Sequence, residues 1–319
     1  MGLVGFGSPG VEEPSEDKKL LNRYLPSEEA KNSFTEKRLD WEVTDPFKIY
    51  SLIHPEFETS FILESSAGPK ELAEYTFLGF DPRTTLTYSD GVFKENGRTF
   101  LETDNPIYHL RYLEKNLGEL FPEKFTGYRG GLVGYVGYDF VRYLENIPAP
   151  SGDKDFPDLE MGLFIDGIIH DRNREELTYF SYGKDRSSKF REILRSNDVR
   201  DRPEFHLTEI ESDFTEPEFA RSVKKVKNYI HSGDIYQTVI SRKLTGTFTG
   251  DQLGAYSRLR NINPSPYMYH LKFDQRRVIG SSPEELVSVR GDEISTYPIA
   301  GTRPLGDTQV EREQLRTDL

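Results

Sequence analysis

The sequence contains no cysteine among its 319 residues. This absence excludes disulfide bonds, thiolate metal sites and a cysteine nucleophile. No apolar run approaches the roughly 20 residues that a membrane-spanning helix needs. The N-terminal residues contain no apolar signal core, and the acidic stretch Glu12–Asp17 is the opposite of an organelle transit peptide. We therefore expect a cytoplasmic protein that does not span a membrane.

Positive charge is in short supply, with 41 Lys and Arg against 54 Asp and Glu and a net charge of −13. Because an acidic chain repels phosphate backbones, we do not expect nucleic-acid binding. Tryptophan occurs once, whereas Tyr occurs 18 times and Phe 21 times. Such aromatic content favours sheets and packed cores over disorder.

Several familiar motifs are absent or occur without their context. Residues 5–10 match G-x-G-x-x-G, but no strand of useful length precedes them and an acidic segment follows, so we reject a dinucleotide site. Arg290-Gly291-Asp292 is explained by a hairpin turn. The six histidines show no metal-binding spacing, and no serine lies in a G-x-S-x-G elbow.

The pattern of elements favours an α+β fold, because many strands occur in antiparallel pairs with a few helices between them. The clearest helix is 216–232, with the capping pair Thr215 and Glu218 and with Gly233 at its end. Ser282–Glu285 has a second capping signature. Other helices are expected at 45–53, 106–118, within 184–203 and from about Asp307, and strands at 61–65, 75–80, 84–88, 163–169, 176–182, 235–244, 267–273, 277–279, 287–290 and 293–297.

Three segments resemble the family of chorismate-using enzymes, which make anthranilate, aminodeoxychorismate, isochorismate or salicylate. They are residues 130–143, beginning Gly-Gly-Leu-Val-Gly-Tyr; residues 233–242, Gly-Asp-Ile-Tyr-Gln-Thr-Val-Ile-Ser-Arg; and residues 263–304, which include Pro-Ile-Ala-Gly-Thr-Arg-Pro. The resemblance extends over residues 41–319. It implies a four-layer sandwich of packed antiparallel sheets with outer helices.

This resemblance also suggests a domain organisation. Residues 1–40 are expected to form a mobile acidic leader. Residues 41–205 are expected to form the N-terminal region typical of the anthranilate-forming members. Residues 206–319 are expected to begin the chorismate-binding region. Because the last helix has no stop signal, we expect the fold to be incomplete at the C-terminus.

Two positions discriminate among the family's branches. Where the isochorismate and salicylate branch has a lysine that activates water, this chain has Gln237, whose neutral amide cannot act as a general base. Where the aminodeoxychorismate branch has a nucleophilic lysine, this chain has Ala300. The pair favours the anthranilate-forming branch. Each residue alone could equally be an ordinary strand residue or a small residue before a glycine turn.

The resemblance also implies binding residues. Gly301 and Thr302 match the family's chorismate-contacting turn, where a backbone N–H and a hydroxyl can donate to a carboxylate. Glu64 and Ser65, with Pro266, Tyr267 and Met268, match the tryptophan feedback site, in which a carboxylate holds an amino group beside an apolar wall. The alternatives are an ordinary Gly-Thr turn and a strand end packed on a core loop.

Activity in this family requires Mg²⁺, which bridges carboxylates of protein and substrate. Its metal ligands and an acid/base histidine lie downstream of the Gly-Thr turn, so no metal ligand is expected in these residues, and we expect this chain alone to be inactive. Without cysteine, the chain must take ammonia from solution or from a glutamine amidotransferase partner. Two alternatives stay open: the large subunit of the aminodeoxychorismate branch, and a non-catalytic tryptophan-binding protein.

Overall fold

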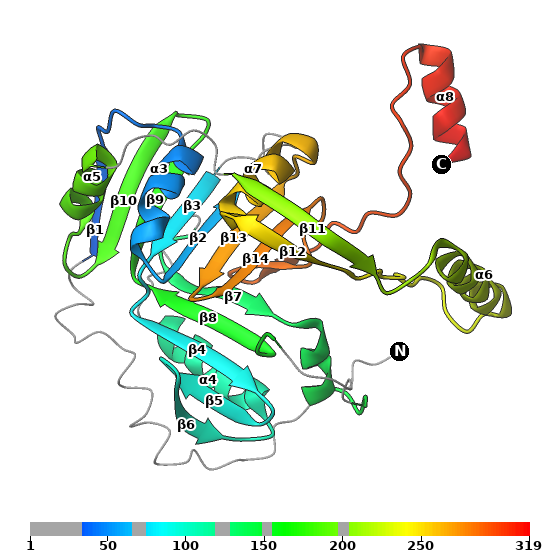
Figure 1. Ribbon diagram of the computed structural model, residues 1–319, viewed down its shortest axis with the longest axis horizontal. Coiled ribbons are helices and arrows are strands. Elements are labelled where there is room, and N and C mark those ends of the chain that lie inside the picture. Colours follow the sequence, from blue (N-terminus) through cyan, green and yellow to red (C-terminus); the bar gives the residue numbers. More distant parts are fainter. Residues whose placement is uncertain (1–33, 66–74, 119–127, 149–154, 197–203) are drawn as a thin grey trace. The chain divides into compact units, whose positions relative to one another are not determined.

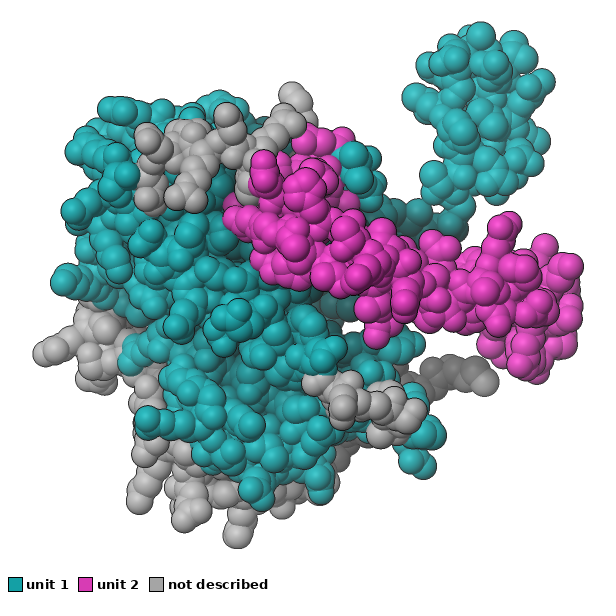
Figure 2. Space-filling model, viewed as in Figure 1, with its two compact units in different colours: residues 1–199, 262–319 teal, residues 200–261 magenta. Residues whose placement is uncertain are grey.

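The described part of the chain forms two compact units (Figure 2). Unit 1 comprises residues 1–199 and 262–319, and unit 2 comprises residues 200–261. The family resemblance predicted a different division, between residues 205 and 206. That division stays a prediction. The computed structural model describes residues 34–65, 75–118, 128–148, 155–196 and 204–319.

Unit 1 contains a seven-stranded antiparallel sheet in the order β1-β10-β9-β3-β2-β13-β14 (Figure 1). Strands far apart in the sequence are neighbours in it, since β2 pairs with β13 across some 200 residues. The strands are β1 (Phe34–Leu39), β2 (Thr59–Glu64), β3 (Tyr75–Phe80), β9 (Asp166–Asp171), β10 (Glu176–Tyr182), β13 (Tyr267–Phe273) and β14 (Arg276–Ser282).

A second sheet of unit 1 has five antiparallel strands in the order β6-β5-β4-β8-β7. Helix α4 (Pro106–Gly118) covers one face of it, where Leu113 and Leu117 pack on Leu86 and Leu163. The strands are β4 (Thr84–Ser89), β5 (Val92–Glu95), β6 (Arg98–Glu102), β7 (Gly131–Val136) and β8 (Leu159–Phe164).

The two sheets pack face to face through an apolar cluster. Phe61 of β2 and Leu271 of β13 contact Val133 of β7 and Phe164 of β8, and the rings of Phe61 and Phe164 lie 4.7 Å apart. The opposite face of the seven-stranded sheet is covered by α3 (Pro46–Ile53) and α5 (Ser187–Ser196). The order helix, sheet, sheet, helix confirms the predicted α+β four-layer sandwich.

Helix α3 begins and ends where local chemistry places it. The side chain of Asp45 accepts a hydrogen bond from the backbone N–H of Phe47, and Pro46 occupies the first turn. Tyr50, which is fully buried, stacks on Phe80 of β3 with ring centroids 5.9 Å apart. The Tyr50 hydroxyl also lies within hydrogen-bonding distance of Ser60 on β2 and His270 on β13, so the helix packs on the strands that contain the candidate binding residues.

Two predictions for unit 1 were wrong. Residues 163–169 were expected to form one strand, but β8 ends at Phe164 and β9 begins at Asp166, so the chain passes from one sheet to the other at Ile165. Residues 34–39, expected to belong to the mobile leader, form β1, which pairs with β10. Residues 1–33 of that leader, with the motif at 5–10, lie outside the described residues.

Unit 2 contains β11 (Phe205–Ser212), α6 (Glu216–Ser232), β12 (Leu244–Gly250) and most of α7 (Gln252–Ile262). Helix α6 has the predicted bounds, the predicted capping box and a left-handed Gly233. The predicted strand 235–244 was wrong, because the strand in this region begins at Leu244. A strand needs a hydrogen-bonding neighbour, and in the described part of unit 2 β11 pairs only with β12.

Two short strands and a helix lie in the last part of the chain, within and after the third family segment. Strands β15 (Ser288–Arg290) and β16 (Glu293–Ser295) form the predicted hairpin, with Gly291 at positive φ. Helix α8 (Gln309–Asp318) is capped by Thr308. The helix predicted from Ser282 was wrong, because the Ser282 hydroxyl accepts from the Glu284 N–H in a turn. No helix in the described ranges is long and apolar enough to cross a membrane.

Candidate functional site

Strand pairing brings together two of the five residues predicted for a tryptophan site. Glu64, the last residue of β2, is the direct register partner of Met268 on β13. Directly paired residues of an antiparallel ladder point to the same face, and these side chains are both buried, 6% and 1% exposed. A carboxylate and a thioether therefore lie side by side at one end of the sheet.

The other three predicted residues flank this pair. Pro266 precedes β13 and Ser65 follows β2, at the same end of the sheet. Tyr267 precedes Met268 on β13, so its side chain points to the opposite face. Burial and the Glu285 carboxylate raise the pKa of the Tyr267 phenol. The pairing thus does not place Tyr267 beside Glu64.

The row of register partners that begins with Met268 and Glu64 continues across two further strands. Glu64 pairs with Thr76 of β3, and Thr76 pairs with His170 of β9. Both side chains are buried, and burial lowers the pKa of His170 despite the nearby Glu175 carboxylate. The imidazole is therefore neutral at neutral pH. Sequence reasoning missed Thr76 and His170, because only the strand register places them beside Glu64.

Arg172, which lies between the predicted strands 163–169 and 176–182, was also missed. It follows β9, and its Nη1 donates a hydrogen bond to the backbone carbonyl of Ser65 at 2.8 Å. Since β3 lies between β9 and β2, the side chain crosses the end of β3 to reach Ser65. This contact brings a guanidinium to the backbone of Ser65, the residue that follows Glu64.

The residues predicted to contact chorismate lie on exposed segments. Gly301 and Thr302 follow β16 in unit 1 and are exposed. Upstream of them, the Ile299 N–H donates to the Glu284 carboxylate at 3.2 Å, which joins the middle of the third family segment to its last part. Gln237 belongs to unit 2 and is exposed. Their membership of one site stays a prediction.

Three other buried carboxylates of unit 1 accept hydrogen bonds from arginines. Glu160 accepts two hydrogen bonds from Arg276, one of them from Nε at 2.9 Å. Likewise, Asp158 accepts from Arg142 at 2.7 Å, and Asp166 accepts from Arg186. No cluster of three Asp, Glu or His side chains in the described ranges could hold a metal ion. The acidic and histidine side chains in the described ranges therefore do not fit a Mg²⁺ site, and no catalytic step is assigned to a metal at these residues.

The first family segment has a structural explanation. A Cβ added to Gly134 would lie 2.0 Å from the backbone carbonyl oxygen of Glu160, so only glycine permits β7 to approach β8 there. Arg142 bonds the Asp158 carboxylate and the Tyr143 hydroxyl, which fastens the turn after β7 to the five-stranded sheet. Tyr138 of the same segment is 93% exposed.

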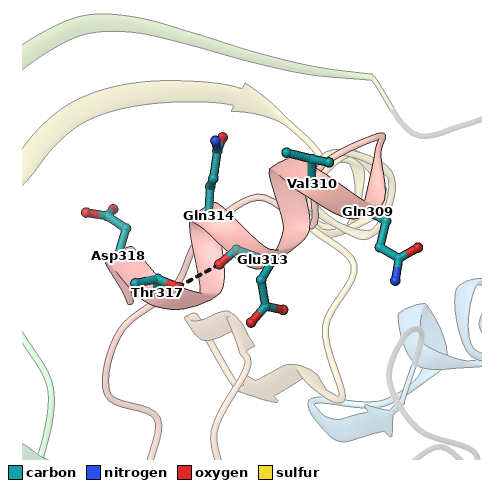
Figure 3. Close-up of a pocket in the computed structure, with 6 residues that line it drawn as sticks. All are labelled: Gln309, Val310, Glu313, Gln314, Thr317 and Asp318. Atoms are coloured by element: carbon teal, nitrogen blue, oxygen red, sulfur yellow. Dashed lines mark hydrogen bonds between the residues drawn. The ribbon is translucent and has the colours of Figure 1, made fainter.

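A surface hollow on α8 is not a candidate site (Figure 3). One helix face provides its entire lining, and the only internal bond drawn joins the Thr317 hydroxyl to the Glu313 carbonyl. A single helix cannot enclose a small ligand, whereas binding sites bury most of the ligand surface. The end of the β2–β13 pair is therefore the better-defined candidate.

Comparison with known proteins identifies the family. The model of the chorismate binding enzyme family matches residues 58–319, and this chain belongs to that family. Its relatives include anthranilate synthase component 1 of Methanothermobacter thermautotrophicus, 37% identical over 91% of this chain and 61% of the relative. The protein of the same name from Lactococcus lactis is 31% identical over 89% of this chain and 64% of the relative.

A relative with a different name is aminodeoxychorismate synthase component 1 of Bacillus subtilis, 31% identical over 81% of this chain and 57% of the relative. The chain thus spans roughly 60% of the length of these curated relatives. Among solved structures, anthranilate synthase component I of Streptococcus pneumoniae matches with a TM-score of 0.61 and 23% identity. The match covers 77% of this chain and 56% of that one, and it supports the fold alone.

Proposed function

We propose that the chain belongs to an anthranilate synthase large subunit that converts chorismate and ammonia to anthranilate and pyruvate, for tryptophan biosynthesis. The observation that supports this most strongly is the 37% identity, over 91% of the chain, to a protein named anthranilate synthase component 1. The residues at positions 237 and 300 support the same branch.

The chemistry of these two positions explains the choice. The amide of Gln237 has no basic lone pair near neutral pH, so it cannot activate water as a nucleophile. The methyl group of Ala300 cannot attack the substrate. Ammonia needs neither kind of help, because it is already nucleophilic. A site with Gln237 and Ala300 is therefore suited to direct amination of the ring. Gly301 and Thr302 would hold a chorismate carboxylate.

The ammonia would come from a partner subunit. A chain without cysteine cannot use the thiol chemistry of a glutaminase, so we propose a separate glutamine amidotransferase as its source. Mg²⁺ is proposed as the cofactor of the complete enzyme from the family resemblance, and we assign none of its ligands to the described residues.

One rival has specific support. A relative named aminodeoxychorismate synthase component 1 is 31% identical over 81% of this chain. That reaction would retain the enolpyruvyl group, whereas anthranilate formation releases pyruvate. Alanine at position 300 speaks against a covalent lysine route.

The product separates these functions. The natural gene product, given chorismate, Mg²⁺ and ammonium, is expected to yield blue-fluorescent anthranilate and an equal amount of pyruvate, measured with lactate dehydrogenase. Accumulation of aminodeoxychorismate without pyruvate would overturn the proposal in favour of its rival. Isochorismate formation without ammonium would place the chain in the water-using branch.

The 319 residues alone are proposed to be inactive, since they correspond to roughly 60% of the length of the relatives. The same assay applied to this chain is expected to give no anthranilate. Anthranilate from this chain alone would contradict that expectation and at the same time support the proposed reaction.

A tryptophan feedback site is the regulatory part of the proposal. The ammonium group of tryptophan would bind the Glu64 carboxylate, with Ser65 and Pro266 around it and Met268 against the indole. Replacing Glu64 by glutamine removes the charge but keeps the shape. We expect tryptophan affinity to fall about tenfold, as loss of a charge-assisted hydrogen bond implies. Calorimetry with tryptophan measures this change.

A matched control is available near the start of the same strand. Glu58 is exposed and immediately precedes β2. Glu58→Gln makes the same chemical change and is expected to leave tryptophan affinity unaltered. Equal effects of the two substitutions would show that the charge lost at Glu64 acts only at long range and not by direct contact.

A further inference from the structure

The turn between β9 and β10 presents an arginine in a fixed position. The Asp171 carboxylate accepts hydrogen bonds from the N–H groups of Asn173 and Arg174, both at 3.0 Å, and Glu175 closes the turn at positive φ. Such an Asx turn holds the backbone rigid. The neighbouring residue, Arg172, therefore extends from a well-defined base.

The strand register directs Arg172 towards the end of β2. Asp171 pairs with Tyr75 of β3, and the next residue of β3, Thr76, pairs with Glu64. From there the Arg172 side chain spans the end of β3 and donates to the Ser65 carbonyl at 2.8 Å. The guanidinium thus lies at the same end of the sheet as Glu64 and Met268.

The chemistry of this end of the sheet matches a zwitterion with an apolar side chain. A free amino acid has an ammonium group and a carboxylate, and the proposed function assigns only the ammonium group, to Glu64. The carboxylate requires a donor of opposite charge. A guanidinium has five N–H donors in a planar fork suited to carboxylates, and the Ser65 carbonyl uses one of them.

We propose that Arg172 binds the α-carboxylate of the amino-acid effector while it holds Ser65 in place. The inference rests on the tryptophan site of the proposed function. Glu64, at the end of β2, and Arg172, in the turn after β9, then recognise the two charged groups of one ligand, and Met268, the register partner of Glu64, contacts its apolar side chain. Amines and acids that lack one of the two groups would bind weakly.

The test compares tryptophan with tryptamine, which has the same indole and ammonium group but no carboxylate. Calorimetry on the wild-type chain is expected to show tryptophan binding at least tenfold more tightly than tryptamine. Arg172→Ala is expected to weaken tryptophan binding by about ten- to a hundredfold, the range of one charge-assisted bond. Its tryptamine affinity should change less than about twofold.

Two further variants sharpen the comparison. Arg174→Ala removes a cation from the same turn. Its side chain is 74% exposed and lies 3.7 Å from the Asp171 carboxylate, so both affinities should stay unaltered. Arg172→Lys keeps the charge without the planar fork and should restore part of the preference for tryptophan. Because the readout is a ratio of two ligands on one protein, partial misfolding would not mimic it.

The outcomes are distinguishable. Equal losses of tryptophan and tryptamine affinity in Arg172→Ala would overturn the carboxylate contact and leave only support of Ser65. A wild-type chain that binds neither ligand would overturn the tryptophan site itself, and the inference with it. Preference for tryptophan that survives Arg172→Ala would place the carboxylate on another residue.

Discussion

Arg276→Ala is expected to destabilise unit 1 by about 3 kcal/mol, near the lower end of the cost of breaking a buried ion pair. Arg276 donates two hydrogen bonds to the Glu160 carboxylate. Arg276 lies on β14 of the seven-stranded sheet and Glu160 on β8 of the five-stranded sheet, so this ion pair links the two sheets. Glu160 is 4% exposed at its side chain. Without its partner this charge would stay buried beside the Tyr135 hydroxyl, which alone cannot replace the cation.

The measurement is urea denaturation followed by the fluorescence of Trp41, the only tryptophan, which is 8% exposed in unit 1. A matched control is Arg38→Ala, since Arg38 pairs with Glu176 at 2.7 Å but its side chain is 70% exposed. That substitution should cost less than about 1 kcal/mol. Equal midpoint shifts for both variants would contradict the fastening role of the buried pair.

The same structure shows which elements the sequence could predict. Helices α3, α4 and α6 were predicted within a residue or two, because caps and apolar spacing are local signals. The break between β8 and β9 was not predictable, because Leu163–Ile169 is an almost unbroken apolar run. Leu163 faces α4 while Phe164 faces the other sheet, and only tertiary packing shows where the chain changes sheets.

The candidate site was likewise predictable only in its local features. Glu64 and Met268 could be named from the family resemblance, but their contact depends on a register between strands some 200 residues apart. Arg172 lies between two predicted strands, yet its contact with Ser65 depends on the position of β3 between β9 and β2. Turn chemistry is local, whereas strand order depends on the whole sheet.

A second large effect is expected from pH, because two histidines are buried, one at the C-terminal end of α3 and one on β13. His270 on β13 is fully buried and bonds the Tyr50 hydroxyl through Nδ1 at 2.8 Å. His54, 5% exposed, stacks on the ring of Tyr50. Burial is the main cause that lowers the pKa of each ring from 6.5 to about 3, and His270 (for His54), Arg277 and Lys272 contribute to the same shift.

These pKa values predict a loss of stability on mild acidification. Below pH 6.5 the unfolded chain binds protons at both histidines, while the folded chain stays neutral there until about pH 3. Unfolding therefore takes up protons, and its free energy falls as the pH falls. Between about pH 7.5 and about pH 5.5 the loss should be about 1.4 kcal/mol for each histidine, since one pKa unit corresponds to that energy.

The variant His54→Phe isolates one of the two histidines. It keeps an aromatic ring against Tyr50 and removes one titrating group, so the difference in unfolding free energy between the two pH values should shrink by about 1.4 kcal/mol. His206→Phe changes an exposed histidine of unit 2 and should leave that difference unaltered. Urea titrations of Trp41 fluorescence give the free energies. An identical pH dependence in wild type and His54→Phe would mean that His54 titrates with the same pKa in the folded and the unfolded chain, which its burial against the ring of Tyr50 should prevent.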